Sequence, residues 1–64
     1  MTWCIVEAPH FYAAAVFDGN TVKRAAPIIG YMGGMSLAYV RSYCVRKRWL
    51  LTIYHDDGTI EYAP

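Results

Sequence analysis

Two groups of side chains in this sequence could do chemistry: the cysteines and histidines, and a run of basic residues. The residue types suited to binding zinc are Cys4, His10, Cys44 and His55. Their spacing contains no CxxC or HxxxH pair, so it provides no local chelate of the kind found in zinc sites. The sequence therefore predicts no metal site and no cofactor. The two cysteines are expected to be small buried residues with reduced thiols.

The sequence also lacks the marks of a catalytic centre. No motif places a cysteine beside a histidine as an activated nucleophile, and no two acids have a spacing suited to general acid–base catalysis. The glycines of "GYMGG", residues 30–34, lack the lysine and serine of a phosphate-binding loop and are better explained as a helix end. We therefore expect a binding protein without catalytic residues.

The basic residues are concentrated in "VRSYCVRKRW", residues 40–49. This stretch contains Arg41, Arg46, Lys47 and Arg48, four of the chain's six basic residues, and it contains no acid. One interpretation is a surface that binds a polyanion such as DNA. The other is that these cations interact favourably with the dipole at a helix C-terminus and keep an outer face solvated. The residues alone leave both interpretations open.

Length and composition limit the class of protein. The 64 residues suffice for one domain, 1–64, in which the gain from burial nearly equals the cost of ordering the chain. The apolar fraction is 56%, which is high for a soluble domain and favours a homodimer or an apolar binding face. The net charge of +1 is far below that of a strongly basic nucleic-acid-binding protein.

The chain shows no targeting signal. Its N-terminus has no basic region, and Glu7, Pro9 and His10 interrupt the apolar residues there, so neither a signal peptide nor a membrane span is expected. A secreted protein of this size would usually carry several disulfides, whereas this chain has two cysteines. We therefore expect a cytoplasmic protein with no membrane partner.

Turn residues and apolar patterning predict two hairpin regions. "DGN" at 18–20 and "DDG" at 56–58 are hairpin turn signals. The segments beside them are rich in β-branched and aromatic residues, as strands are. The expected strands are 2–7, 11–17, 21–26, 49–55 and 59–63.

Two short helices are expected between the hairpins, at 27–32 and 37–48. Pro27 suits the first turn of one helix, glycines end it, and Ser36 is a good N-cap for the other. The predicted fold class is α+β: β-hairpins, two short helices in a helix-turn-helix-like corner, and a C-terminal β-hairpin, in the order ββααββ. Over residues 27–63 this order resembles a winged-helix domain, in element order only.

A helical projection of the second helix places Arg41, Arg46 and Arg48 opposite the apolar residues, with Lys47 in the last turn. The leading hypothesis is therefore a module that binds nucleic acid such as DNA through these four residues. The acidic tip of the would-be wing, "HDDG", is unfavourable for phosphate contacts. The alternative is a module that binds a protein partner, because six tyrosines and two tryptophans could line an interface, a core or an RNA-binding sheet.

Several segments also resemble a pattern in small uncharacterised proteins of bacteriophages and prophages. These segments are "EAPHF" at 7–11, a "DG" turn, "AAPI" at 25–28 and a helix that ends before Trp49. The resemblance covers most of the chain, but that group has no assigned activity, so no site residues are implied. It implies a small accessory protein that binds and modulates a host or phage macromolecule, which fits both hypotheses.

Overall fold

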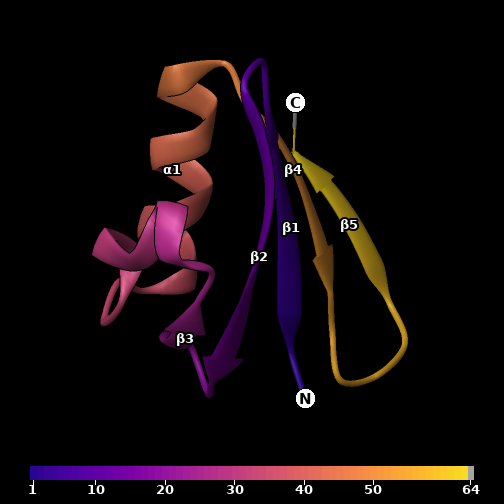
Figure 1. Ribbon diagram of the computed structural model, residues 1–64. Helices are drawn as coiled ribbons and strands as arrows, with labels where there is room; N and C mark the ends of the chain where they lie inside the picture. Colours follow the sequence, from indigo (N-terminus) through magenta and orange to yellow (C-terminus); the bar gives the residue numbers. More distant parts are fainter. Residues whose placement is uncertain (64) are drawn as a thin grey trace.

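A single antiparallel sheet forms one layer of the structure, and the helical segments form the other (Figure 1). The computed structural model describes residues 1–63. The strands are β1 (Trp3–Ala8), β2 (Phe11–Asp18), β3 (Thr21–Ala25), β4 (Leu50–Tyr54) and β5 (Ile60–Ala63). They pair in the order β3-β2-β1-β4-β5, so the first strand of the chain lies at the centre of the sheet.

Tight turns join neighbouring strands where the sequence predicts hairpins. Gly19, with a φ of 62°, lies in the β2–β3 turn, and Gly58, with a φ of 90°, lies in the β4–β5 turn. Glycine adopts this left-handed region without the steric cost that other residues meet. The His55 N–H donates to the Thr59 carbonyl across the second turn, at 2.9 Å. Both hairpin predictions are confirmed.

The helical layer contains one 3₁₀ segment, η1 (Pro27–Met32), and one α-helix, α1 (Leu37–Lys47). Ser36 is the N-cap of α1, as the sequence predicts, and its hydroxyl accepts a hydrogen bond from the Tyr39 N–H at 3.1 Å. Arg48 ends α1 in the left-handed conformation, with a φ of 60°, and its N–H donates to carbonyls of the last turn. Neither helical segment within residues 1–63 is long and apolar enough to cross a membrane.

The predicted ββααββ order with a helix-turn-helix-like corner is wrong. Three strands precede η1 and α1, two follow them, and all five strands belong to one sheet. η1 is not an α-helix: it has only six residues, and Ile29 within it has non-helical backbone angles (φ −117°, ψ 27°). So short a segment does not offset the cost of nucleating an α-helix. Within residues 1–63 there is consequently no second α-helix to complete a helix-turn-helix corner.

The core lies between the inner face of the sheet and the helical layer. α1 contributes Val40 and Cys44, and η1 contributes Ile29 and Met32, all fully buried. The inward side chains of the strands complete it: Cys4, Val6, Ala13, Ala15, Phe17, Val22, Leu51, Ile53 and Ala63. Figure 1 shows that both helical segments lie on the same side of the sheet, so the opposite face has no helix over it in the described chain.

Candidate functional site

The face of the sheet that points away from the helical layer is largely apolar, and we call it the open face. Residues that pair directly across antiparallel strands point to the same side of a sheet, so the strand register defines the members of this face. They are Trp3, Ile5 and Glu7 of β1, Tyr12, Ala14 and Val16 of β2, Arg24 of β3, Leu50, Thr52 and Tyr54 of β4, and Ile60 and Tyr62 of β5.

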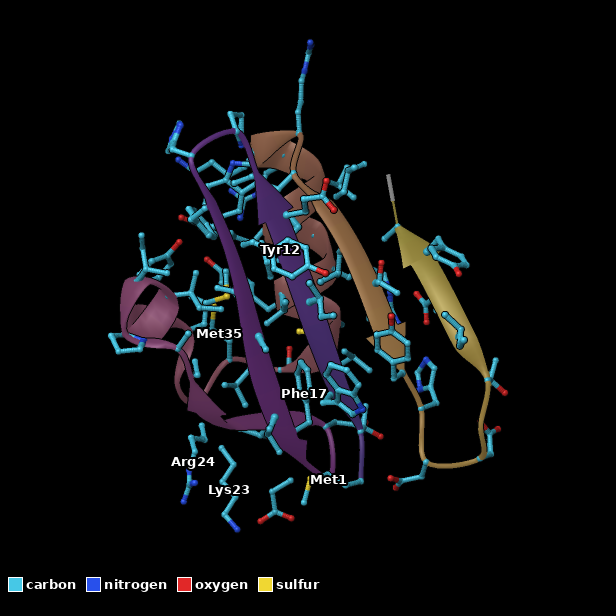
Figure 2. All side chains as sticks on the ribbon, turned by 45° about the vertical axis from the view of Figure 1, so that its right-hand side comes forward. Met1, Tyr12, Phe17, Lys23, Arg24 and Met35 are labelled. Carbon is cyan, nitrogen blue, oxygen red and sulfur yellow. The ribbon has the colours of Figure 1, made fainter. Side chains whose placement is uncertain are left out.

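Several large apolar side chains of the open face are strongly exposed. Tyr62 is 74% exposed, Tyr12 69%, Leu50 54% and Ile60 47%. Figure 2 shows Tyr12 in front of the sheet, with α1 behind it. Single exposed apolar residues are common on protein surfaces, but a contiguous patch of them marks an interaction site. The sheet therefore has two apolar faces, of which the helical layer covers one.

Trp3 and Tyr54 form an ordered aromatic pair on the open face. Their rings are stacked, with centroids 4.3 Å apart and an interplanar angle of 13°. They occupy directly paired positions on β1 and β4, so the sheet itself holds the two rings together. Rings that are already ordered lose little conformational freedom when a partner covers them.

The register places one basic residue on the open face, Arg24 beside Val16, and toward the opposite end of the face it places the acidic residue Glu7. Glu7 lies on the central strand, about 13 Å along it from Trp3. Its direct neighbours on β2 and β4 are Tyr12 and Leu50. A hollow of about 550 Å³ lies beside it, lined by Glu7, Leu50, Leu51, Thr52, Tyr62 and Ala63. The open face therefore carries one carboxylate in an apolar surrounding.

Tyrosines and basic residues form a second surface on the helical layer. We call it the tyrosine–cation surface, and it consists of Tyr31, Tyr39, Tyr43, Arg46 and Lys47. The Arg46 guanidinium lies 5.9 Å from the ring centroid of Tyr39 and 5.7 Å from that of Tyr43. The Lys47 ammonium lies 5.7 Å from the Tyr43 centroid. These are cation–π distances, and because residues 19–55 contain no acid, the helical layer carries only positive side-chain charge.

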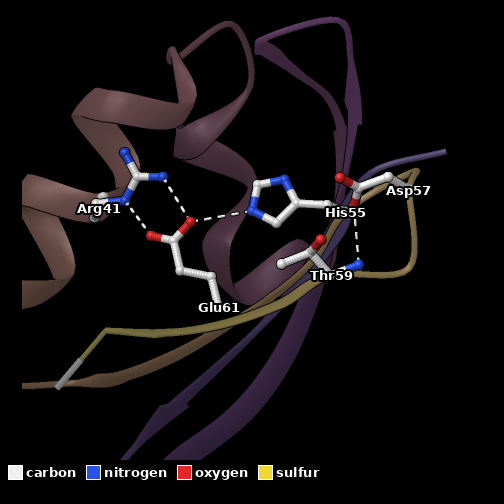
Figure 3. A network of polar contacts seen from close by, with 5 residues as sticks. All are labelled: Arg41, His55, Asp57, Thr59 and Glu61. Atoms are coloured by element: carbon white, nitrogen blue, oxygen red, sulfur yellow. Dashed lines mark hydrogen bonds and ion pairs between the residues drawn. The ribbon is translucent and has the colours of Figure 1, made fainter.

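Arg41 is held apart from this surface by an acid of β5. Its Nε and Nη2 atoms donate to the two carboxylate oxygens of Glu61 at 2.6 and 3.0 Å, and His55 Nε2 lies 3.0 Å from the same carboxylate (Figure 3). These hydrogen bonds, from Arg41 first and then from His55, hold the pKa of Glu61 below its ordinary value. Arg41 would have to break a bidentate pair before it could bind a phosphate.

The four basic residues expected to bind nucleic acid therefore do not share one face. Positions 41 and 46 are separated by about 140° around a helix, and their side chains contact different parts of the molecule. Arg46 and Lys47 meet at the Tyr43 ring. Arg48 is exposed and lies at the C-cap, beyond the end of α1. The structure groups two of the expected residues and separates Arg41 from them.

Cys4 and Cys44 are free thiols buried in the core. Burial raises the pKa of each to about 11, and for Cys4 the nearby Cys44 adds to the shift. Both thiols are therefore protonated at neutral pH, which makes them poor nucleophiles and poor ligands. In residues 1–63, no group of three or more His, Cys, Asp or Glu side chains is placed to hold a metal ion.

A second hollow, of about 450 Å³, lies at the other end of the sheet, where Lys23 and Arg24 lie near Met1 (Figure 2). Asp18 and Asp56 also line it, and the terminal amine of Met1 pairs with Asp56. Because side chains of both signs meet there, this hollow favours neither an anionic nor a cationic ligand.

Comparisons with protein family models, curated proteins and solved structures gave no match. The candidate surfaces therefore rest on the geometry of this chain. Sequence reasoning favoured a homodimer or an apolar binding face but did not place such a face on the sheet, although a signal for its position was present. In β1, Trp3 and Ile5 alternate with Cys4 and Val6, so both sides of the strand are apolar. Such a strand lies either between two layers or in a sheet with an uncovered apolar face.

Proposed function

We propose that this protein is a non-catalytic binding module whose open face binds another protein. One observation carries the proposal: Tyr12, Leu50, Ile60 and Tyr62 are about half or more exposed on a face that no helix of the described chain covers. Strand spacings give the face a size of roughly 20 Å by 15 Å. That is the scale of the largest apolar patches on monomeric proteins, which are often interaction sites. Exposed aromatic residues are also the side chains enriched in protein interfaces.

The charge of the open face favours a protein over a nucleic acid. Proteins that bind single strands combine aromatic residues with a positively charged groove. Here the charged residues Glu7 and Arg24 have opposite signs and lie toward opposite ends of the face, so the face is not a positively charged groove. A phosphate chain crossing this face would approach a carboxylate and gain at most one arginine contact.

The proposed context is a small phage-type accessory protein that occupies the surface of a host or phage protein. Such a module would modulate its partner by covering part of it, because the proposal gives it no catalytic residues. A cytoplasmic location belongs to the same proposal, since two free buried thiols suit a reducing compartment.

Affinity purification of the tagged protein from the cells that produce it tests this function. We expect a partner to co-purify in near-stoichiometric amount with wild type and to be lost from the double variant Tyr12→Ser/Tyr62→Ser. Both side chains are more than two-thirds exposed, so the fold should survive their removal. The matched control is Tyr31→Ser, which removes a tyrosine that is 52% exposed on the helical layer. Equal capture by all three proteins would contradict the proposal.

The tyrosine–cation surface supports a second candidate function, the binding of single-stranded nucleic acid. Arg46 and Lys47 lie beside tyrosine rings on which a base could stack, and Arg48 follows them in the chain. With Arg41 engaged by Glu61, these three of the four expected basic residues remain for phosphate contacts.

Titration with a single-stranded oligonucleotide at several salt concentrations tests this second function. Three phosphate contacts predict a log–log slope of affinity against salt of about −2. Replacing both Arg46 and Lys47 by Gln should reduce the slope to about −0.7, whereas Arg41→Gln should leave it unchanged. A dissociation constant for wild type weaker than roughly 10⁻⁴ M, the weak end of non-specific association, would contradict nucleic-acid binding.

A further inference from the structure

We propose that Glu7 and the hollow beside it bind a lysine or arginine side chain of the partner protein. This inference rests on the proposed function and adds the chemistry by which the open face selects its partner. On the open face, Glu7, Leu50, Thr52 and Tyr62 line the hollow. It therefore combines one carboxylate, an apolar wall and an aromatic ring. A long cationic side chain can contact all three, because its stem is apolar and its end is charged.

The carboxylate of Glu7 is available for such a contact. Its neighbours on β2 and β4 carry no charge, and within residues 1–63 it takes part in no hydrogen bond or ion pair. Glu61 provides the contrast, because Arg41 and His55 occupy both of its carboxylate oxygens. Glu61 joins parts of the fold, whereas Glu7 faces outward with its bonding capacity unused.

The position of Glu7 means that its charge affects which partner can bind once the open face is covered. Glu7 lies between Tyr12 and Leu50, so a partner that covers these two exposed side chains removes water from its carboxylate. Burying an unpaired carboxylate is costly, and the cost is offset only when the partner supplies a cation or hydrogen-bond donors. A purely apolar partner surface is therefore rejected, and a basic side chain surrounded by apolar ones is selected.

Two other occupants fit the same surface less well. A second copy of this chain, packed face to face about a two-fold axis close to the hollow, would bring two Glu7 carboxylates into one desolvated interface, and only an axis nearer the middle of the face would set Arg24 of one copy against Glu7 of the other. A nucleic acid would bring phosphates to the same carboxylate. The flanking rings favour a cation as well, because Tyr62 lines the hollow, Tyr12 pairs with Glu7 from β2, and the face of a tyrosine ring attracts positive charge.

A displayed library of short peptides of random sequence, selected on the immobilised full chain, tests the inference. Selections run in parallel on wild type, Glu7→Gln, Glu7→Lys and Asp18→Asn, and thermal unfolding checks that each variant is folded. Asp18→Asn is the matched control, because it removes an exposed acid at the far end of β2 from the hollow. Fluorescence anisotropy then measures the affinity of synthetic copies of the enriched peptides for each variant.

Wild type and Asp18→Asn should enrich peptides in which Lys or Arg is flanked by apolar residues. Glu7→Gln should weaken the binding of these peptides about tenfold, close to the lower limit of the effects measured for close charge pairs at interfaces. Glu7→Lys should enrich Asp or Glu in their place. The inference would be overturned, and the proposed function would stand, if the enriched peptides lose binding to Tyr12→Ser/Tyr62→Ser but contain no excess of Lys or Arg and bind Glu7→Gln as tightly as wild type. If no enriched peptide responds to that double variant, the proposed function itself fails.

Discussion

Arg41 of α1 and Glu61 of β5 form a bidentate ion pair that joins the helix to an edge strand of the sheet, with donor–acceptor distances of 2.6 and 3.0 Å. β5 has four residues and pairs with β4 alone, so this ion pair gives a short edge strand a second attachment. His55 bonds to the same carboxylate from the turn between β4 and β5. Arg41 therefore stabilises the fold, and the cations available for an external ligand lie elsewhere on the molecule.

Replacing Glu61 by Gln should lower the free energy of unfolding at pH 7 by about 1 kcal/mol. The two side chains of the pair are 37% and 33% exposed, so solvent screening keeps the loss near the range of surface ion pairs. Urea unfolding of wild type and variant measures the difference. Asp18→Asn, which removes an exposed acid without such a partner, should change stability by less than about 0.5 kcal/mol.

The same variant should show a defined pH dependence. The folded-state pKa of Glu61 lies below its ordinary value of 4.5, so the ionised form is favoured by folding. Its contribution to stability is present above pH 4.5 and is lost as the pH falls through the lowered pKa of the folded state. The gap between wild type and Glu61→Gln should therefore be widest at pH 7 and close under more acidic conditions. A gap that stays constant down to pH 3 would contradict a role for the Glu61 charge.

Arg48→Gly should raise the free energy of unfolding by about 0.5–1 kcal/mol. Arg48 has a φ of 60° at the C-cap of α1, a conformation that costs a residue with a Cβ more than it costs glycine. Arg48→Ala is the control, because it shortens the side chain and keeps the strained backbone. Urea unfolding should rank Arg48→Gly above both wild type and Arg48→Ala, and equal stability of the two variants would exclude backbone strain at this position.

The two thiols should be unreactive in the folded protein. With a pKa of about 11 each, Cys4 and Cys44 are ionised in roughly one molecule in ten thousand at pH 7, and both are fully buried. A disulfide reagent that reports thiols by absorbance should therefore label neither cysteine until urea is added. Elemental analysis of the purified protein should find no zinc. Rapid labelling of the native chain, or unfolding by a chelator, would overturn this description of the thiols.

The free edge of β5 offers a route to the homodimer that the apolar composition favours. The β3 edge is partly covered, because the Val22 N–H donates to the Met35 carbonyl at 2.8 Å. Along an antiparallel ladder, pairs of residues that are hydrogen-bonded to each other alternate with pairs that are not. The hydrogen bond from His55 to Thr59 fixes which pairs of the β4–β5 ladder are bonded, and the backbone N–H of Tyr62 consequently points away from β4. Two β5 edges could therefore pair in an antiparallel manner and leave both open faces free.

Sedimentation equilibrium at micromolar concentration should accordingly give about twice the 7.3 kDa chain mass. Tyr62→Pro should give a monomer, because proline removes the outward N–H and leaves the bonds to β4 intact. Tyr62→Ala, which loses the ring but retains the N–H, should remain dimeric. A wild-type monomer at millimolar concentration would exclude the homodimer.

Much of the local structure could be predicted from the sequence, because local signals determine it. These signals are the glycine-containing turns, the Ser36 N-cap and the spacing of apolar residues along α1. Each depends on residues only a few positions apart in the chain. The arrangement of these elements could not be predicted in the same way. A proline followed by two isoleucines suggests a helix, but the segment is six residues long and 3₁₀, which these sequence signals do not distinguish from an α-helix. Whether β1 would lie at an edge or at the centre of the sheet is a long-range outcome.

The candidate site was harder to predict than the fold. A helical projection gives the angle of each arginine around its own helix, but it contains no information about Glu61, which lies twenty residues from Arg41 in the chain and meets it only in the folded structure. The position of the open face was missed for a related reason. Alternating apolar residues on both sides of β1 are compatible with a covered strand or an uncovered one, and that choice depends on where α1 packs.

Site-specific photocross-linking in living cells tests the central claim, protein binding by the open face, most directly. Benzoylphenylalanine replaces Tyr12 on the open face in one strain and Ala38, an exposed residue of α1, in another. The substitution at position 12 retains an aromatic ring, so binding should persist. We predict a covalent protein adduct after irradiation from position 12 and none from position 38. An adduct from position 38 alone, or from neither position, would contradict protein binding through the open face.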